Sequence, residues 1–211
     1  MVRARLFGIV VRSVLVLAFT LAAPAASCLA ATIVVFGDSL AAGYGLPREQ
    51  GWVHLLEQRL RAENLDYKVV NASISGETTL GGVNRIGEVL KAHRPALVIL
   101  ELGANDGLRG APPDSIRRNL EAITDACRRA GARVLLVGIR IPPNYGKVYT
   151  EEFQAVFSRV ARSRKLPLVP FLLDGFPDNR ALFQDDGIHP NATAQPLMLE
   201  TVWTELRPLL K

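Results

Sequence analysis

Short runs of β-branched and aliphatic residues alternate with segments of helical periodicity from Thr32 onward. Runs of this kind are typical of strands that are buried in a sheet. The predicted strands are Thr32 to Phe36, Lys68 to Val70, Ala96 to Leu100, Arg133 to Val137 and Leu166 to Val169. A spacing of about thirty residues between strands suits helical crossovers between parallel neighbours.

The segments between the strands place their apolar residues on one helical face. The four series are Trp52, Leu55, Leu56 and Leu60; Val83, Ile86 and Leu90; Ile116, Leu120 and Ile123; and Phe153, Val156, Phe157 and Val160. Pro112-Pro113-Asp114 opens one helix and Gly131 closes it, while Asn191 can cap a last helix. The sequence therefore predicts an α/β fold, a three-layer sandwich in which a five-stranded parallel sheet has helices on both faces.

No linker or repeat divides the chain after the first thirty residues, so we expect residues 31–211 to form a single domain. In a parallel sheet of this kind the ligand binds beyond the carboxyl ends of the strands, where the strand order reverses. The loops that can carry chemistry are those that follow Phe36, Val70, Leu100, Val137 and Val169.

Charge changes this picture only at the N-terminus. The 211 residues include 25 Lys and Arg against 20 Asp and Glu, a formal net charge of +5. Three arginines and no acid lie in the first thirty residues, so the rest of the chain has 22 basic and 20 acidic residues. Nucleic-acid binding thereby loses its main support, and we expect no nucleic-acid partner.

Residues 1–30 have the features of a secretory signal peptide. A short basic start precedes an apolar stretch, whose uncharged run from Ser13 to Ala26 is fourteen residues long. This is short of the ~20 residues that span a bilayer, so we expect no stable membrane span. We expect cleavage after Ala30 and a periplasmic or secreted protein. The alternative is a lipoprotein anchored through Cys28, because the residues before it weakly resemble a bacterial lipobox.

The first loop of interest, Gly37 to Gly45, follows a buried strand directly and contains Ser39. A glycine-rich turn at this position could cradle a phosphate. However, Gly37 and Gly43 enclose five residues where a Walker loop has four, and Tyr44 follows where that loop has lysine. The dinucleotide pattern is absent as well. What remains is a serine on a tight strand-to-helix turn, which is a candidate nucleophile.

The second informative stretch is Asp185-Asp186-Gly187-Ile188-His189-Pro190. A hydroxyl needs an imidazole to take its proton and a carboxylate to orient that imidazole. His189 is the candidate base and Asp186, three residues before it across a turn-forming glycine, is the preferred orienter. Asp185 remains the competing carboxylate.

Metal catalysis is not expected, because three scattered histidines and the cysteine left after cleavage show no zinc-ligand spacing. That cysteine, Cys127, is in phase with the apolar series that begins at Ile116, which indicates a small buried residue and not a reactive thiol. We therefore expect neither a metal nor a cofactor.

Two further loops offer donors for the oxyanion of a tetrahedral intermediate. The loop from Asn71 to Thr78 contains Gly76, where a backbone N–H can approach a ligand closely. The loop from Glu101 to Asp106 contains Asn105, whose amide can point into the site. Four loops at one sheet edge would thus supply a nucleophile, a base, an orienter and oxyanion donors.

These loops resemble the signature blocks of the SGNH, or GDSL, hydrolases. The matching residues are Gly37-Asp38-Ser39-Leu40, Gly76, Gly103-Ala104-Asn105-Asp106 and Asp186-Gly187-Ile188-His189-Pro190. They follow the family order across nearly the whole chain after its leader. The longer matches around them are similar to the periplasmic multifunctional thioesterase I, arylesterase and lysophospholipase subgroup. The α/β-hydrolase alternative is disfavoured, because Ala41 stands where its nucleophile elbow needs glycine.

The resemblance implies a flavodoxin-like fold with Ser39 as nucleophile, His189 as base and Asp186 as its orienter. It also implies an oxyanion hole made by the N–H groups of Ser39 and Gly76 and the side chain of Asn105. The residues that the resemblance places around a substrate groove are Gly107, Leu108, Arg109, Ile141, Pro142 and Tyr145. The loop from Gly107 to Pro113 is expected to move on acyl-chain binding, with hinges at Gly107 and Gly110.

The principal hypothesis is a serine esterase that hydrolyses acyl esters and thioesters through an acyl-serine intermediate. Its partner would be a small-molecule acyl ester, acyl thioester or lysophospholipid, and we expect a monomer. Two alternatives stay open. The same chemistry could serve an acyltransferase or a carbohydrate deacetylase, and the fold could serve a noncatalytic ligand-binding protein.

Overall fold

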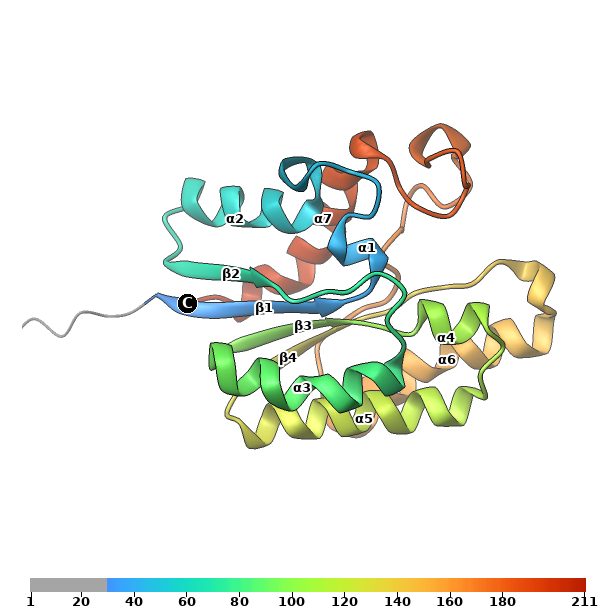
Figure 1. The fold of residues 1–211 in the computed structure, drawn as a ribbon, viewed down its shortest axis with the longest axis horizontal. Coiled ribbons are helices and arrows are strands. Elements are labelled where there is room, and N and C mark those ends of the chain that lie inside the picture. Colours follow the sequence, from blue (N-terminus) through green and yellow to red (C-terminus); the bar gives the residue numbers. More distant parts are fainter. Residues whose placement is uncertain (1–29) are drawn as a thin grey trace, which may run out of the picture.

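The computed structural model describes residues 30–211 and contains the predicted five-stranded parallel sheet (Figure 1). The strands are β1 (Ala31–Gly37), β2 (Tyr67–Asn71), β3 (Leu97–Glu101), β4 (Arg133–Val137) and β5 (Leu168–Val169). They lie in the order β2-β1-β3-β4-β5, and every neighbouring pair is parallel. The predicted fold class is confirmed.

The last strand is shorter than the sequence predicts. Leu166 was expected to open it, but its N–H bonds to the carbonyl of Ala161 at 2.8 Å and so closes the preceding helix. Pro167 has no N–H to give to a ladder, although its carbonyl accepts a bond from Leu136. Only Leu168 and Val169 remain to pair as a regular strand.

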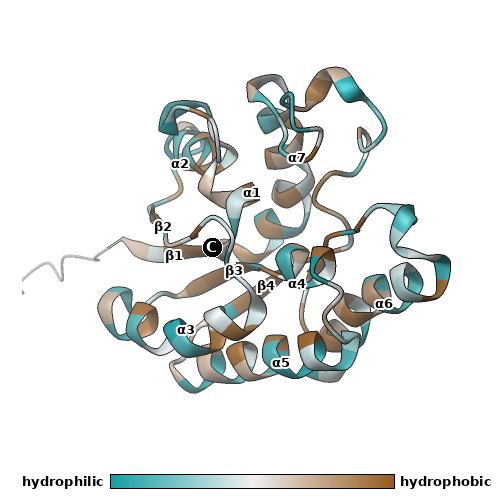
Figure 2. Cartoon of the chain, turned by 45° about the vertical axis from the view of Figure 1, so that its right-hand side comes forward, coloured by the Kyte–Doolittle hydropathy of each residue, from teal (hydrophilic) through white to brown (hydrophobic). Residues whose placement is uncertain are grey.

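Helices cover both faces of the sheet, and the outer faces of these helices are largely hydrophilic (Figures 1 and 2). On one face lie α2 (Trp52–Ala62) and α7 (Gln195–Leu206), and on the other lie α3 (Thr79–His93), α5 (Pro113–Arg129) and α6 (Lys147–Arg164). Two short helices, α1 (Ser39–Ala42) and α4 (Ala104–Leu108), follow β1 and β3 directly. They lie at the carboxyl ends of the strands.

Local sequence explains where α5 begins and ends. Helix α5 starts after Pro112, and the chain leaves it through Gly131 in a left-handed conformation, as predicted. Its residue Cys127 is fully buried, and burial raises the pKa of the thiol to about 12, in keeping with a packing role.

Asn191 does not cap α7 itself. Its side chain accepts a bond from Thr193 and caps a 3₁₀ turn, Ala192–Ala194, that runs into α7. Because Pro196 has no N–H, it fits only the first turn of α7, and the extra turn before the helix supplies the capped start.

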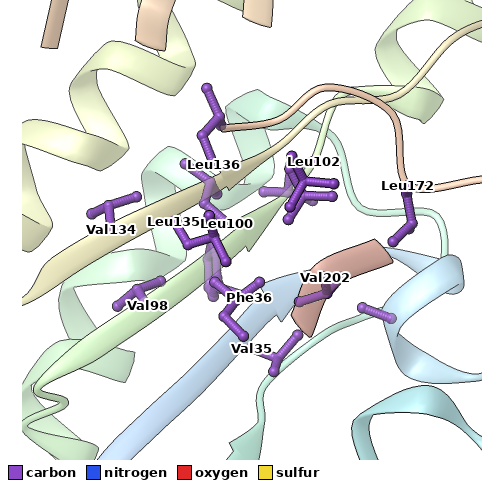
Figure 3. Packing of buried hydrophobic residues seen from close by; sticks show 14 of the residues in the cluster. Val35, Phe36, Val98, Leu100, Leu102, Val134, Leu135, Leu136, Leu172 and Val202 are labelled. Carbon is purple, nitrogen blue, oxygen red and sulfur yellow. The ribbon is translucent and has the colours of Figure 1, made fainter. Parts of the chain in front are cut away.

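The core lies between these layers, and burial is most complete along the central strands. All residues from Ile33 to Phe36 and from Leu97 to Leu100 are inaccessible to solvent. Phe36, Leu100 and Leu136 stand side by side on β1, β3 and β4 and pack with Leu102 beyond the strand end (Figure 3). Such close packing gives a rigid floor to the loops that follow these strands.

Within residues 30–211, no helix is both long enough and apolar enough to cross a membrane. The expected signal peptide and the alternative lipid anchor at Cys28 lie outside the described residues.

Candidate active site

The order in which the chain adds strands to the sheet reverses at β1. After β1 the chain adds β2 on one side, and then β3 joins β1 on the other side. The loops that follow β1 and β3 therefore diverge and leave room for a ligand at the carboxyl edge between them. Ser39 and Asn105 lie in these two loops, in α1 and α4.

The turn that carries Ser39 is fixed by tight packing and by capping. Gly37 must be a glycine, because a Cβ there would lie 2.5 Å from Oε2 of Glu101. Oδ1 of Asp38 accepts the N–H of Leu40 at 3.1 Å and caps α1, and Gly43 ends that helix in a left-handed conformation. Ser39 is therefore held half-buried at the end of β1.

Ser39, His189 and Asp186 form a continuous chain of hydrogen bonds. Oγ of Ser39 lies 3.0 Å from Nε2 of His189, and Nδ1 of His189 lies 2.6 Å from Oδ2 of Asp186. The two carboxylates that sequence analysis left open are thus distinguished, because Asp186 and not Asp185 contacts the imidazole.

The environment of Asp186 keeps its carboxylate ionised. Its Oδ1 accepts the backbone N–H groups of His189 at 3.0 Å and of Ile188 at 2.9 Å. The backbone and ring hydrogen bonds from His189, with that from Ile188, lower the pKa of Asp186 to about 2. Gly187, with φ of 73°, makes the tight turn that aims these donors at one oxygen.

Two residues that sequence analysis missed hold the His189 loop against the Ser39 loop. Nε2 of Gln184 donates to the carbonyl of Tyr44 at 2.8 Å, while the backbone N–H of Gln184 donates to the carbonyl of His189 at 2.8 Å. The ring of Tyr44 lies 4.5 Å from the imidazole of His189, centroid to centroid. The only signal in the sequence was the place of each residue beside a motif.

The predicted oxyanion donors come together from two loops. Nδ2 of Asn105 lies 3.1 Å from Oδ2 of Asp38 and 3.1 Å from the carbonyl of Glu77. Because Gly76 precedes Glu77, this second bond holds the Gly76 turn beside Asn105. Gly76 is exposed, has φ of 81°, and has open space around it.

Helix α4 is itself anchored by a buried carboxylate. Asp106 accepts the backbone N–H of Thr79 at 2.8 Å and its hydroxyl at 2.6 Å. Asn119 donates to the same hydroxyl at 3.0 Å. These bonds join α4 to α3 and α5, so the position of Asn105 is set by three elements of the fold.

Two more acids lie beneath the site, and sequence analysis gave neither a role. Asp38 and Glu101 are both buried, and Oε2 of Glu101 accepts the backbone N–H of Asp38 at 3.3 Å. Burial raises the pKa of Asp38 to about 6 and that of Glu101 well above its ordinary value, and the nearby Asp38 carboxylate raises the pKa of Glu101 further. An acid directly after an apolar strand is the signal that could have identified Glu101.

The expected groove residues lie next to one another, but Gly107 is not in a loop. It lies inside α4, where a Cβ would come 2.6 Å from Phe153 and 2.7 Å from Ile141. Close packing, not hinge motion, accounts for the glycine. Gly110 differs, since its φ is 68° and it has open space around it.

The remaining groove residues connect α4 to the loop after β4. Oη of Tyr145 donates to the carbonyl of Leu108 at 3.0 Å, and Ile141 is buried while Pro142 is exposed. Arg109 is exposed, and its Nη2 lies 3.5 Å from the carbonyl of Gly76. The structure therefore brings these six residues to the side of the site that carries Asn105.

A serine, an imidazole and a carboxylate in hydrogen-bonding series, beside amide donors at the edge of a parallel sheet, define the class of serine hydrolases. Comparison of the sequence with family models identifies which one. The chain belongs to the GDSL-like lipase/acylhydrolase family, whose model matches residues 35–195. The expected family is confirmed.

Relatives in this family carry names of ester and thioester hydrolases. Esterase TesA of Pseudomonas aeruginosa is 51% identical over 86% of this chain and 90% of its own length. The arylesterase of Vibrio mimicus is 43% identical over 91% of this chain and 95% of its own. Thioesterase 1/protease 1/lysophospholipase L1 of Escherichia coli is 40% identical over 85% of each chain.

Solved structures agree with the fold. The crystal structure of TesA superposes with a TM-score of 0.83 at 51% identity, covering 85% of this chain and 99% of that one. The psychrotrophic esterase EstA from Pseudoalteromonas, inhibited by monoethylphosphonate, gives a TM-score of 0.81 at 39% identity, covering 84% and 97%. The chain is thus an enzyme of the serine hydrolase class.

Proposed function

We propose that this enzyme hydrolyses acyl esters and acyl thioesters through a covalent intermediate on Ser39. The observation that carries the proposal is the hydrogen-bonded series from Ser39 through His189 to Asp186, at 3.0 and 2.6 Å. A hydroxyl in this setting can lose its proton to the imidazole as it attacks a carbonyl carbon.

The first half of the reaction acylates Ser39. Its Oγ bonds to the carbonyl carbon while Nε2 of His189 takes the hydroxyl proton. The carbonyl oxygen becomes an oxyanion, which the N–H groups of Ser39 and Gly76 and the amide of Asn105 stabilise. His189 then gives the proton to the departing alcohol or thiol, and the bond from carbon to the leaving group breaks.

The second half releases the acid. A water molecule gives a proton to His189 and attacks the acyl carbon, and the same three donors hold the oxyanion. The proton returns to Oγ of Ser39 as the ester bond breaks. Asp186, ionised at neutral pH, keeps Nδ1 of His189 protonated in both halves and stabilises the imidazolium.

The rim of the site favours substrates with an apolar acyl or aryl group. Tyr44, Ile74 and Ile188 are large apolar residues that are exposed, and each lies on a loop that carries a site residue. Exposed apolar residues in such a group mark a binding surface. Together with the names of the relatives, this supports aryl esters, fatty acyl thioesters and lysophospholipids as substrates.

Two expectations about the setting of the enzyme belong to the same proposal. The leader in residues 1–30 supports export to the periplasm or medium, which mass spectrometry of the mature N-terminus would test. Action as a monomer is testable by light scattering at assay concentrations.

Hydrolysis of a p-nitrophenyl ester series from acetyl to palmitoyl tests the function. We expect turnover by the wild type and a loss of kcat of about 10⁴-fold or more in Ser39→Ala and His189→Ala. Full activity in folded Ser39→Ala would contradict the proposal. A fluorophosphonate should label Ser39, whereas a noncatalytic binding protein would not react. New ester in place of free acid, with an alcohol or glycan present, would indicate a transferase.

A further inference from the structure

The two carboxylate oxygens of Asp38 have different partners. Oδ1 accepts the N–H of Leu40 and caps the helix that begins at Ser39, while Oδ2 lies 3.1 Å from Nδ2 of Asn105. The side chain is completely buried. One carboxylate therefore joins the turn of the nucleophile to an amide in α4, the helix that follows the neighbouring strand β3.

Capping of α1 alone does not explain why position 38 is an aspartate. A serine hydroxyl caps a helix about as well as an aspartate, and it can be buried at far lower cost than a carboxylate. The cost at this position is visible in the pKa of Asp38, which burial raises to about 6. The second oxygen, which a serine hydroxyl or an amide cannot supply, is directed at Asn105.

The contacts of Asn105 explain why that oxygen is useful. A side-chain amide can turn over, so that its oxygen takes the place of its nitrogen. An amide oxygen facing an oxyanion would repel it. Here the amide nitrogen has two acceptors, the carboxylate of Asp38 and the backbone carbonyl of Glu77, each at 3.1 Å. Neither acceptor can donate to the amide oxygen while Asp38 is ionised, so both favour one orientation.

The backbone of Asp38 is also held in place, by Glu101. Oε2 of the buried Glu101 accepts the backbone N–H of Asp38, and Glu101 ends the strand that leads to Asn105. The nucleophile turn and the amide donor are therefore linked twice, through the backbone and through the side chain of Asp38.

We propose that Asp38 is a positioning residue for ester hydrolysis: its Oδ2 keeps one N–H of the Asn105 amide, so that the other N–H, which lies on the Glu77 carbonyl in this structure, can turn to the developing oxyanion. The inference rests on the proposed function of the site and extends it. Asp38 does not touch the substrate and acts through Asn105. Its contribution must therefore depend on whether the Asn105 amide is present.

A double-mutant cycle measures this dependence. Asp38→Ser keeps a capping oxygen for Leu40 and removes the oxygen that contacts Asn105. We expect it to lower kcat for p-nitrophenyl butyrate by about 10- to 100-fold with little change in KM, because the oxyanion exists only after attack. In an Asn105→Ala background the same substitution should lower kcat by no more than about threefold.

A matched control is available on the other side of the same turn. Nδ2 of Asn71 donates to the carbonyl of Ala41 in α1 at 2.8 Å. We expect any loss of kcat in Asn71→Ala to be the same in the wild-type and Asn105→Ala backgrounds. This pattern is what a purely structural effect on the turn produces.

The outcomes separate the inference from the function on which it rests. Equal losses of kcat from Asp38→Ser in both backgrounds, or no loss in either, would overturn the positioning role. Ser39-dependent turnover by the wild type would still support the proposed esterase activity. Absence of Ser39-dependent turnover in the wild type would overturn both. Should Asp38→Ser not fold, Asp38→Asn is tested in the same cycle, since its single oxygen cannot serve both Leu40 and Asn105.

Discussion

Asp186 contacts His189 and Asp38 directly precedes Ser39 in the chain, and the two carboxylates differ in environment. Asp186 is partly exposed and accepts three hydrogen bonds, which lower its pKa to about 2. Asp38 is buried beside another acid, and its pKa is raised to about 6. The Asp186 carboxylate is therefore ionised at any pH at which an esterase is assayed. The Asp38 carboxylate is ionised at neutral pH only at a cost in folding free energy.

The raised pKa of Asp38 predicts how the free energy of unfolding depends on pH. Because folding raises the pKa of Asp38 above its unfolded value of 3.8, the folded protein binds the proton more tightly. The free energy of unfolding should therefore fall as the pH rises from about 4 to about 6, by roughly 2 to 3 kcal/mol for this group alone.

Urea denaturation of the wild type and Asp38→Asn across this pH range checks the slope. Asp106 and His189 act on Asp38 electrostatically, Glu101 titrates beside it, and all three remain in the variant, so only the difference between the two curves is assigned to Asp38. We expect the variant to have the shallower fall. Parallel curves would show that Asp38 does not titrate in this window.

At the scale of elements, most boundaries follow from local sequence. Hydrophobic periodicity located all five strands and the main helices, because each element buries one stripe or run of residues. Two boundaries did not follow. The shortened β5 and the 3₁₀ turn before α7 depend on which neighbouring carbonyl takes each N–H, and that choice is made by the folded chain.

A substitution in α4 tests whether Gly107 is required for close packing. Gly107→Ala would bring a Cβ 2.6 Å from the ring of Phe153, so we expect a loss of about 1 to 3 kcal/mol in the free energy of unfolding. Gly87→Ala is the matched control, because that glycine lies within α3 with nothing within 4 Å of the new Cβ. It should gain up to about 1 kcal/mol. Urea denaturation of both variants measures these changes. A Gly107→Ala variant with the free energy of unfolding of the wild type would contradict the packing explanation.

At the scale of the whole molecule, the sequence predicted the proposed triad and its oxyanion donors but not the contacts that hold them in place. Ser39, Asp186 and His189 were identifiable because each chemical role leaves a local motif. Tyr44 and Gln184 leave none, since their contact joins positions 140 residues apart in the chain. Asp38 was read as part of a motif, yet its bond to Asn105 exists only because β1 and β3 are neighbours.

The bond between Gln184 and Tyr44 makes a prediction about how the two halves of the site are held together. The His189 loop comes from the C-terminal part of the chain and meets the Ser39 loop through Gln184, whose Nε2 also lies 3.2 Å from the carbonyl of Pro190. Gln184→Ala removes these bonds but leaves the backbone pairing of Gln184 with His189 and of Asn191 with Leu182.

We therefore expect Gln184→Ala to keep its fold and to lose about tenfold in kcat, because His189 would be aimed less often at Ser39. Amide hydrogen exchange should speed up in residues 185–189 and stay unchanged in the central strands. Gln58→Ala is the control, since Gln58 is an exposed residue of α2 whose side chain bonds to His54 on the same helix. Unchanged exchange in the loop, or an equal loss of kcat in the control, would mean that the backbone pairing alone is enough to hold the two halves of the site in register.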